Sequence, residues 1–248
     1  MAGTLLVTGA SRGIGAAVAR LGAAAGYAVC VNYRSDAAAA AAVVRAIEAA
    51  GGRALAVKAD VARESEVERL FATVDAELPP LAALVNNAGI CGHVSRLEEA
   101  SSETLRDVME LNVLGLIWCC QAAVRRMAQR YGGKGGAIVN LSSGAVTIGS
   151  PGEYVWYAAS KGAVDSLTLG LAKENAREGI RVNAVAPGFV RTEIHAASGM
   201  PDRLETVAPT MPIGRAAEPE EIAEAVLWLL GDKASYTTGA VLRVAGGR

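Results

Sequence analysis

Short apolar runs alternate with longer amphipathic stretches along the whole sequence, and this alternation restricts the fold more than any other feature. The runs lie at residues 5–7, 28–31, 54–57, 81–85, 137–141, 181–185 and 241–244. Runs that are apolar on both faces are typical of strands buried inside a parallel sheet. Helical periodicity is expected between them, near 14–25, 36–50, 63–77, 103–130, 155–178 and 218–231. The pattern predicts an α/β fold, with a single doubly wound parallel sheet of about seven strands between two helical layers.

The chain shows no linker, internal repeat or shift in composition that would divide its 248 residues. The six alanines at 37–42 are followed at helical spacing by Val43, Val44 and Ile47, which indicates an amphipathic helix rather than a low-complexity linker. We therefore expect one domain over residues 1–248.

The charge balance and the cysteines exclude several classes of function. With 24 Lys and Arg against 25 Asp and Glu, the formal net charge is −1, which favours neither nucleic acid nor an anionic membrane as a partner. No segment has the roughly 20 uniformly apolar residues that a membrane span needs. The four cysteines lack metal-ligand and redox spacing, so we expect no metal. The first residues show no signal-peptide pattern, and we expect a cytoplasmic protein.

A glycine-rich segment, TGASRGIG at 8–15, follows the first apolar run and opens a predicted helix. Glycines there let the backbone approach a pyrophosphate, and the helix N-terminus offers free N–H groups. The spacing Gly-x-x-x-Gly-x-Gly differs from the common Gly-x-Gly-x-x-Gly, and no Gly-Lys-Ser/Thr follows to make a P-loop. A tight turn without a ligand is the alternative interpretation, but the position at the first strand–helix turn favours phosphate binding.

The end of the second run carries the residues that choose between cofactors. An acidic residue there would bind the adenosine ribose of NAD, whereas an arginine accommodates the 2′-phosphate of NADP. Arg34 follows the strand and Arg12 lies in the glycine turn, so both can converge on one phosphate. Asp36 is the competing residue, because a small backbone shift would bring it to the ribose. We predict NADP(H), with NAD as the alternative.

A candidate catalytic group follows the fifth run and opens a later helix. Tyr157 and Lys161 are four residues apart, which places them on one face of a helix. A nearby ammonium stabilises a phenolate, and lowering a tyrosine pKa from ~10 to ~7 requires about 4 kcal/mol. Ser142 and Ser143 offer a neutral hydroxyl that could hold a substrate oxygen. On its own, such a Tyr/Lys pair is usually part of a solvated helix face.

Taken together, these motifs resemble the short-chain dehydrogenase/reductase family. The resemblance rests on the glycine turn, Asn86-Asn87-Ala88-Gly89, the Ser143, Tyr157 and Lys161 series, and Pro187-Gly188, and it covers essentially the whole chain. Within the family, the chain is similar to 3-oxoacyl-carrier-protein reductases and glucose 1-dehydrogenases. The resemblance implies a Rossmann sheet and a homotetramer, whose interfaces would involve the helices at 103–130 and 155–178.

The resemblance also implies catalytic roles. Tyr157 would be the acid/base, Lys161 would lower its pKa and bind the nicotinamide ribose, and Ser143 would orient the substrate oxygen. Asn112 would support a proton-relay water beside Lys161. The loop between Ser143 and Tyr157 is one residue longer than in the commonest pattern, which leaves Ser142 as the alternative; we choose Ser143.

Further residues are expected at the cofactor. Asp60 would contact the adenine, Ile14 and Gly15 the pyrophosphate, and Val190 and Thr192 the nicotinamide carboxamide. The full expected set is Gly9, Ser11, Arg12, Gly13, Ile14, Gly15, Asn32, Tyr33, Arg34, Asp60, Val61, Asn87, Ala88, Gly89, Tyr157, Lys161, Pro187, Gly188, Val190 and Thr192.

A substrate lid is predicted near 190–214. Residues 194–214 lack clear periodicity and contain Gly199, Pro201, Pro209 and Pro212, which interrupt regular structure. Its apolar residues, Met200, Leu204, Val207 and Met211, either line a hydrophobic pocket or pack a short lid helix. We see no arginine cluster there that calls for a carboxylate or phosphate substrate. His93, His195, Tyr154 and Trp156 lie near the expected site, and their roles stay open.

We expect an oxidoreductase that transfers a hydride between NADP(H) and a small carbonyl or alcohol substrate, with reduction of a ketone such as a 3-oxoacyl thioester as the first choice. Two alternatives remain: an NAD-dependent sugar or polyol dehydrogenase, and a catalytically silent NADP(H)-binding regulator. The sequence does not identify the substrate.

Overall fold

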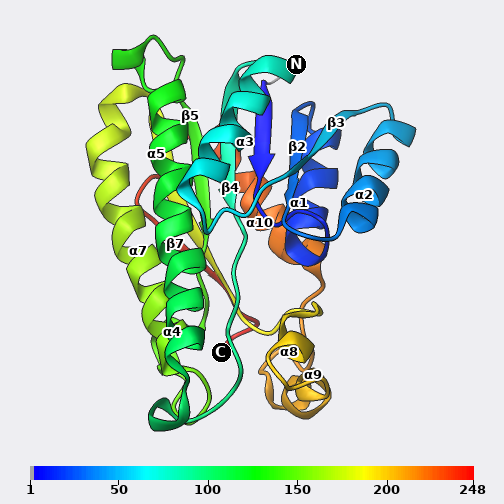
Figure 1. The fold of residues 1–248 in the computed structure, drawn as a ribbon, viewed down its shortest axis with the longest axis vertical. Helices are drawn as coiled ribbons and strands as arrows, with labels where there is room; N and C mark the ends of the chain where they lie inside the picture. Colours follow the sequence, from blue (N-terminus) through cyan, green and yellow to red (C-terminus); the bar gives the residue numbers. More distant parts are fainter. Residues whose placement is uncertain (1–2) are drawn as a thin grey trace.

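Seven parallel strands form one sheet at the centre of the computed structural model, which describes residues 3–248 (Figure 1). The strand order is β3-β2-β1-β4-β5-β6-β7. The strands are β1 (Thr4–Val7), β2 (Ala28–Tyr33), β3 (Arg53–Lys58), β4 (Leu81–Asn86), β5 (Gly136–Leu141), β6 (Ile180–Pro187) and β7 (Val241–Val244). The chain order reverses at β1, which is the switch point where doubly wound sheets bind their ligands. The predicted fold class is confirmed.

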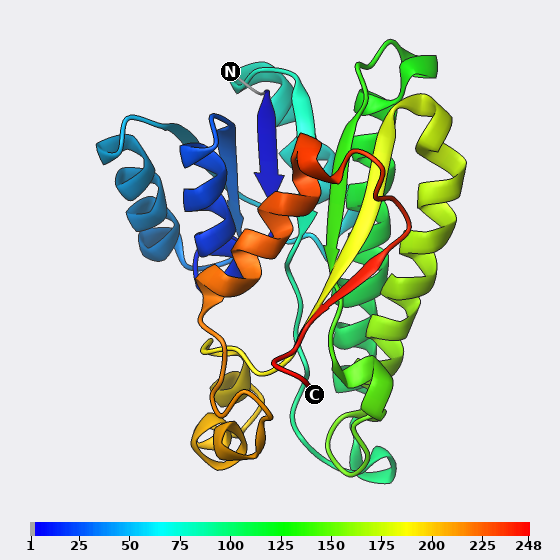
Figure 2. The ribbon, with the colours of Figure 1, turned by 180° about the vertical axis from the view of Figure 1, so that it is seen from behind.

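Helices cover both faces of this sheet (Figures 1 and 2). They are α1 (Gly13–Ala24), α2 (Ala37–Ala49), α3 (Glu64–Glu77), α4 (Ser102–Met109), α5 (Leu116–Met127), α6 (Ala145–Ile148), α7 (Val155–Asn175), α8 (Ile194–Ala197), α9 (Arg203–Val207) and α10 (Pro219–Leu230). Helices α1, α2 and α10 contribute to the apolar core on one face, and α3, α5 and α7 contribute to the core on the other.

The alternation of side chains along each strand divides its residues between these two cores. In β1, Leu5 and Val7 belong to the first core and Leu6 to the second, and all three are fully buried. This two-sided burial is why the strands read as continuous apolar runs in the sequence.

The stretch expected as one helix over 103–130 is divided in the structure. Helix α4 ends at Met109, a π-helical segment covers Glu110–Gly115, and α5 runs from Leu116 to Met127. Gly115 packs so closely on the backbone of Val61 that a Cβ there would lie 2.5 Å from the Val61 carbonyl oxygen. The wider turn therefore accompanies a close contact with the loop after β3, a long-range constraint that helical periodicity does not contain.

Within residues 3–248, one helical stretch, Ser102–Met127, is long and apolar enough to span a membrane by length and composition alone. Its buried residues include Leu116, Cys119 and Ala123, which pack in the core between α5 and the sheet. A core helix of a folded domain meets the same length and composition test, and packing accounts for its apolarity here.

Beyond the carboxyl ends of the strands, the segment expected as a lid folds into α8, α9 and a short 3₁₀ helix, Ala208–Thr210 (Figure 1). Met211 is buried, whereas Leu204 and Val207 are only partly covered. Of the two interpretations of these apolar residues, the structure therefore favours the packing of short helices.

A buried chain of hydrogen bonds ties α7 to the sheet. Asn86 Nδ2 in β4 donates to Asn140 Oδ1 in β5 at 2.9 Å, and Asn140 Nδ2 donates to Thr168 Oγ1 in α7 at 2.9 Å. Thr168 Oγ1 donates in turn to the Val164 carbonyl oxygen at 2.8 Å. Because α7 also carries the candidate catalytic residues, this chain fixes their height above the sheet.

Replacing Thr168 by Val keeps the shape of the side chain but removes the acceptor for Asn140 Nδ2. A buried donor without a partner costs about 1–3 kcal/mol, so we expect Thr168→Val to lower the free energy of unfolding by this amount in urea denaturation. Thr168→Ser keeps the hydroxyl and is the matched control. A Thr168→Val variant that is no less stable than Thr168→Ser would contradict the contribution of this hydrogen bond.

Candidate active site

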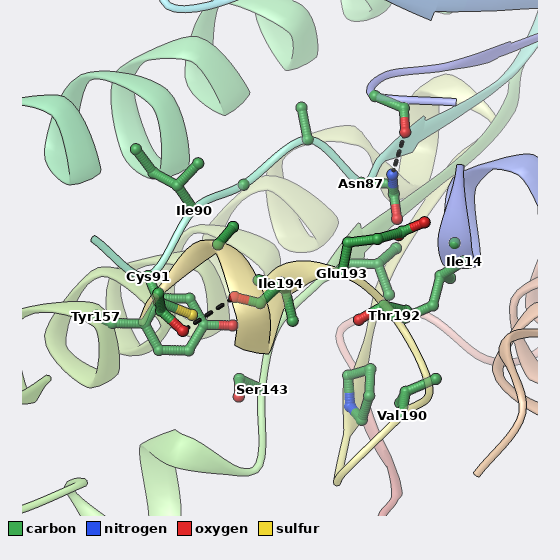
Figure 3. A pocket seen from close by; sticks show the side chains of 18 of the residues that line it. Ile14, Asn87, Ile90, Cys91, Ser143, Tyr157, Val190, Thr192, Glu193 and Ile194 are labelled. Carbon is green, nitrogen blue, oxygen red and sulfur yellow. Dashed lines mark hydrogen bonds between the residues drawn. The ribbon is translucent and has the colours of Figure 1, made fainter. Parts of the chain in front are cut away.

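A cavity of about 570 Å³ opens at the carboxyl edge of the sheet. The loops that follow β1, β2, β3, β4, β5 and β6 line it, together with residues of α8 and α9. All the predicted site residues except Gly15 and Asn112 are among its lining residues. Figure 3 shows Ser143 and Tyr157 toward one side of this cavity and Ile14 and Thr192 toward the other.

The glycine turn after β1 brings its backbone to the cavity wall. Gly9 and Gly13 have φ values of +61° and +52°, a conformation that favours glycine. A Cβ on Gly15 would lie 2.5 Å from Asn87 Nδ2 and 2.6 Å from the Gly9 carbonyl oxygen, so only glycine fits there. The turn leads into the N-terminus of α1, where the preceding Arg12 makes no side-chain cap. Its free N–H groups and the close-packed glycines fit a pyrophosphate group.

Three polar side chains fix the shape of this turn. Thr8 Oγ1 accepts hydrogen bonds from the backbone N–H groups of Asn87 and Ala88, both at 3.0 Å. Asn87 Nδ2 donates to the carbonyl oxygens of Thr8 and Gly9 at 2.9 and 3.0 Å. A dashed line in Figure 3 marks one hydrogen bond of this side chain. Asn32 Oδ1 accepts from the Gly9 N–H at 3.2 Å, while its Nδ2 donates to the Ala59 carbonyl at 3.0 Å. The side chains of Asn32 and Asn87 thus join the ends of the central strands.

The glycine turn and the residues after β2 together present two cations and one carboxylate to the cavity. Arg12 Nη2 lies 3.0 Å from Asp36 Oδ2, and both side chains are about half exposed. Asp36 Oδ1 also accepts the Ala39 N–H at 2.9 Å and thereby caps α2. Arg34 is exposed and has no ion-pair partner within the described residues. Asp36 is therefore already engaged by helix and arginine, whereas Arg34 is available to a ligand.

The loops after β3 and β6 complete the expected cofactor wall. Asp60 Oδ1 accepts the Ala62 N–H at 3.1 Å, which shapes the loop after β3, and the side chain of Val61 is buried. After β6, Val190 is buried and pairs with Ala217 in a parallel bridge. Thr192 Cγ2 would lie 3.1 Å from a Cβ on Gly13, so the side chain packs against the start of α1.

Tyr157 and Lys161 lie one turn apart near the start of α7, and both are buried. Lys161 Nζ donates to the Leu141 carbonyl oxygen at 2.8 Å and lies 5.7 Å from the centroid of the Tyr157 ring. Ser143 is close enough to Tyr157 for a hydrogen bond that lowers the tyrosine's pKa. Ser143 Oγ also accepts the Ala145 N–H at 3.1 Å. The three side chains therefore meet at one wall of the cavity.

Burial acts on the two titratable groups in opposite directions. It raises the pKa of Tyr157 above 10.0, and nearby Cys91 adds to this rise. Burial lowers the pKa of Lys161 from 10.5 to about 8, with Cys91 and Asp165 opposing the change. Lys161 is not among the groups that act on the Tyr157 pKa here, so its expected effect on the tyrosine stays a prediction.

Of the two candidate serines, the structure turns Ser143 toward Tyr157 and Ser142 toward Asp165. Ser142 is buried, and its hydroxyl lowers the pKa of the Asp165 carboxyl, which burial otherwise raises. The longer loop before Tyr157 is accommodated by Ser150, whose φ of +47° makes a tight turn. The choice of Ser143 as the residue facing the tyrosine agrees with this geometry.

Asn112 lies in the π-helical segment, behind the cavity wall. Its Nδ2 donates to the Ile90 carbonyl at 2.8 Å and to Ser160 Oγ at 3.1 Å, and its Oδ1 accepts the Ile90 N–H at 2.9 Å. Asn112 Oδ1 and Lys161 Nζ both lie beside Gly89, at 3.2 and 3.4 Å from the position of its missing Cβ. The amide therefore braces the loop after β4 next to Lys161.

Several residues of this wall were not identified from the sequence. Cys91 follows β4 and lies beside Tyr157, and its carbonyl oxygen accepts the indole N–H of Trp156 at 2.9 Å. The rings of Tyr154 and Tyr157 meet edge to face, with centroids 5.4 Å apart. Arg203, at the start of α9, also lines the cavity. Tyr154 and Trp156 were noted in the sequence without a role, whereas Cys91 and Arg203 reach the site from segments distant in the sequence, which no local spacing signals.

The two histidines flagged in the sequence both line the cavity. Burial lowers the pKa of His195, and nearby Arg203 adds to this effect. Its ring packs against Phe189, with centroids 5.7 Å apart. His93 lies against Gly199, between α8 and α9, where a Cβ would meet its ring at 2.6 Å.

The lowered pKa of Lys161 predicts a specific pH dependence of stability. Below pH 8 the cost of the buried ammonium is present in full, and it is relieved as the pH rises from about 8 toward 10.5, because the folded state then binds fewer protons. Relative to Lys161→Met, the wild-type free energy of unfolding should therefore rise over this window by up to about 3 kcal/mol. Tyr157 is present in both proteins, so its titration cancels.

Urea denaturation between pH 7 and pH 10.5 measures this difference. The exposed lysine of the same helix provides the control, since Lys173→Met should run parallel to the wild type across the window. A constant difference between Lys161→Met and wild type would contradict the assigned pKa direction.

Comparison with known proteins places this geometry in a family. A family model described as Enoyl-(Acyl carrier protein) reductase matches residues 9–248. The oxidoreductase YgfF of Escherichia coli (strain K12) is 51% identical over 243 residues, which cover 98% of this chain and 98% of that protein. The 3-oxoacyl-[acyl-carrier-protein] reductase of Synechocystis sp. is 41% identical and covers 98% of this chain and 95% of its own length.

Among solved structures, the short chain dehydrogenase from Burkholderia cenocepacia J2315 in complex with NADP superposes with a TM-score of 0.91. It is 33% identical, and the match covers 100% of this chain and 98% of that chain. Both the sequence and the fold are thus shared over nearly the full length. The chain belongs to the short-chain dehydrogenase/reductase family and is an oxidoreductase that acts on CH–OH or C=O groups.

Proposed function

We propose that this protein transfers a hydride between NADP(H) and a ketone or secondary alcohol, and that its physiological direction is reduction of a ketone such as a 3-oxoacyl thioester. The observation that carries the proposal is the meeting of Ser143, Tyr157 and Lys161 at one end of a cavity whose other end presents Arg12 and Arg34. A family relative named as a 3-oxoacyl-[acyl-carrier-protein] reductase supports the substrate class.

NADPH, when bound, supplies the hydride that reduces the carbonyl carbon. The Ser143 hydroxyl donates a hydrogen bond to the substrate oxygen and holds that oxygen beside Tyr157. Because burial raises the pKa of Tyr157, its phenol is protonated at neutral pH and ready to donate a proton to that oxygen. Lys161, with a pKa near 8, can return a proton to the tyrosine oxygen at neutral pH, and Asn112 braces the adjoining loop.

The residues around the cavity fit the cofactor in the following way. The glycine turn and the N-terminus of α1 would hold the pyrophosphate, and Asp60 and Val61 would flank the adenine. Val190 and Thr192 would bind the carboxamide, as the family resemblance implies, and Thr192 packs beside Gly13 at the start of α1. The close contact of Gly15 with Asn87 would keep this cradle free of side-chain atoms.

Arg34 and Arg12 would select NADP over NAD by binding the 2′-phosphate. Asp36, the competing residue, is held by the α2 cap and by Arg12, which leaves it poorly placed for a ribose hydroxyl. The NADP-bound structure of the Burkholderia relative supports this choice of cofactor.

Replacing Arg34 by Ala removes a charge-assisted contact, which contributes about 1.5–3 kcal/mol. We expect Arg34→Ala to reduce the ratio of NADP⁺ to NAD⁺ affinity by at least about 10-fold, measured by fluorescence titration of each cofactor. Arg45→Ala, an exposed arginine of α2 outside the cavity, is the control. An unchanged ratio in Arg34→Ala would mean that the arginine does not read the phosphate.

The proposed activity is tested by following NADPH oxidation with a short 3-oxoacyl thioester, with NADH in parallel. We expect turnover that prefers NADPH, a loss of at least about 1,000-fold in Tyr157→Phe, and unchanged NADPH binding in that variant. Tyr236→Phe, at a fully exposed tyrosine, should behave as the wild type.

Other outcomes separate the rival functions. Faster turnover of sugars or polyols with NAD⁺ would indicate the polyol dehydrogenase. Binding of NADPH without turnover of any carbonyl compound, and without an effect of Tyr157→Phe, would indicate a silent regulatory member of the family.

We also propose that the chain works in the cytoplasm as a homotetramer, with residues 190–214 acting as a substrate lid on a single domain of residues 1–248. Exposed apolar side chains on the expected interface helices support the assembly: Met109 of α4 is 41% exposed, Leu114 of the π-helical segment 43%, and Leu169 of α7 47%. Burial of these apolar side chains against a second copy of the chain would stabilise the assembly.

A further inference from the structure

Two arginines meet an aromatic ring at the substrate end of the cavity. Arg203 comes from α9 and Arg248 follows β7, and both line the cavity. The guanidinium carbons of Arg203 and Arg248 lie 5.2 and 4.9 Å from the centroid of Phe189, which follows β6. The same carbon of Arg203 lies 5.5 Å from the centroid of Tyr154. Distant segments therefore assemble a cationic group that the sequence shows no sign of.

Arg203 is unusually buried for an arginine, with 8% of its side chain exposed. Its Nη2 donates to Glu153 Oε2 at 2.6 Å, and its Nη1 is directed at Met200 Sδ. Its Nε–H has no hydrogen-bond partner within residues 3–248. Buried guanidinium donors are normally satisfied, so this N–H requires an acceptor that the described chain does not supply.

The ion pair leaves the arginine, not the glutamate, at the cavity surface. Arg203 lines the cavity, while Glu153 is absent from the lining residues of the described chain. Glu153 therefore holds the guanidinium from behind and fixes its orientation. A ligand in the cavity meets the cation before it meets the carboxylate.

The other charged groups nearby do not cancel this cation toward the cavity. His195 packs on Phe189, and burial and Arg203 both lower its pKa, so it is neutral at pH 7. Glu193 also lines the cavity, but Figure 3 places its side chain near Ile14 and Thr192, at the cofactor end. Arg248 adds a second positive charge on the Phe189 ring.

The path from this cation to the candidate catalytic tyrosine is apolar and short. The ring of Tyr154 lies between them, 5.4 Å from the Tyr157 ring and 5.5 Å from the Arg203 guanidinium. Tyr154, Ile194 and Met200 belong to one apolar cluster with Tyr157. A substrate whose oxygen reaches Tyr157 thus passes along an apolar surface and ends at a guanidinium.

We propose that Arg203, assisted by Arg248, binds a carboxylate carried by the substrate, so that the preferred substrates are keto acids or hydroxy acids in which several apolar carbons separate the reacting carbon from the acid group. This assignment rests on the proposed oxidoreductase function and deepens it. Arg203 is the specificity-determining residue, and Glu153 is a positioning residue that acts through it.

The test compares each keto acid with its own methyl ester, which removes only the charge. The series runs from 4-oxopentanoate to 8-oxononanoate, which varies the number of carbons between the ketone and the carboxylate. The acid with the highest kcat/KM then gives the chain length that best spans Tyr157 and Arg203. With NADPH, we expect kcat/KM for the best acid to exceed that of its ester by about 10- to 100-fold. Arg203→Met should bring this ratio close to one, whatever the absolute rates of the variant are.

Three further variants distinguish recognition from a general effect on folding. Arg203→Lys keeps the charge and should retain part of the preference, and Glu153→Gln keeps the guanidinium and should preserve an acid preference with a shifted KM. Arg215→Met removes an exposed arginine that pairs with Glu221 and serves as the matched control, with an unchanged ratio. Because the ratio is measured within one preparation, a smaller folded fraction cancels.

Calorimetric titration of the same acids and esters into the NADP⁺-loaded protein reads recognition without turnover. Tighter binding of the acid, lost in Arg203→Met, supports the proposal even if no ketone of the series is reduced, in which case the proposed function fails alone. Equal binding and equal turnover of acid and ester, or a preference that survives Arg203→Met, overturns carboxylate recognition and leaves the reductase function intact.

Discussion

Parallel pairing of all seven strands is the constraint on which the rest of this molecule depends. Because all strands are parallel, their carboxyl ends lie at the same edge of the sheet. The loops after β1, β2, β4, β5 and β6 therefore meet at that edge. The cost is that both faces of the sheet must be covered, and the Ala-rich helices on one side and α3, α5 and α7 on the other provide this cover. Thr8, Asn32 and Asn87 then join the strand ends by hydrogen bonds, which makes the edge a rigid frame.

The frame buries both Tyr157 and Lys161, and this burial affects their pKa values as well as any attraction between them. At the surface of α7, an ammonium one turn from a phenol lowers the phenol's pKa; inside the cavity, loss of water favours the neutral form of each. The result is a protonated phenol and a lysine that titrates close to neutral pH. Such a pair is suited to delivering a proton to a carbonyl oxygen and receiving another, which agrees with the reductive direction proposed above.

The local sequence pattern was enough to predict the strands, because a strand buried on both faces consists of consecutive apolar residues, as in Leu5, Leu6 and Val7. The glycine turn and the meeting of Ser143, Tyr157 and Lys161 were also predictable, since each depends on short spacing or on the common edge of a parallel sheet. The π-helical turn was not, because it follows a contact between Gly115 and the backbone of Val61. The same holds for the pKa directions and for Arg203, whose partners Glu153, Phe189 and Tyr154 come from separate loops.

The ion pair between Glu153 and Arg203 has a mechanical consequence. Glu153 immediately precedes Tyr154 and the first turn of α7, while Arg203 belongs to α9 above the cavity. Two backbone hydrogen bonds reinforce the connection, from Ser95 N to the Glu153 carbonyl and from Val94 N to the Ser198 carbonyl. Helix α9 and the beginning of the helix that carries the candidate catalytic residues are therefore joined by one ion pair and supported by these two hydrogen bonds, so we expect a displacement of α9 to move the backbone that precedes Tyr157.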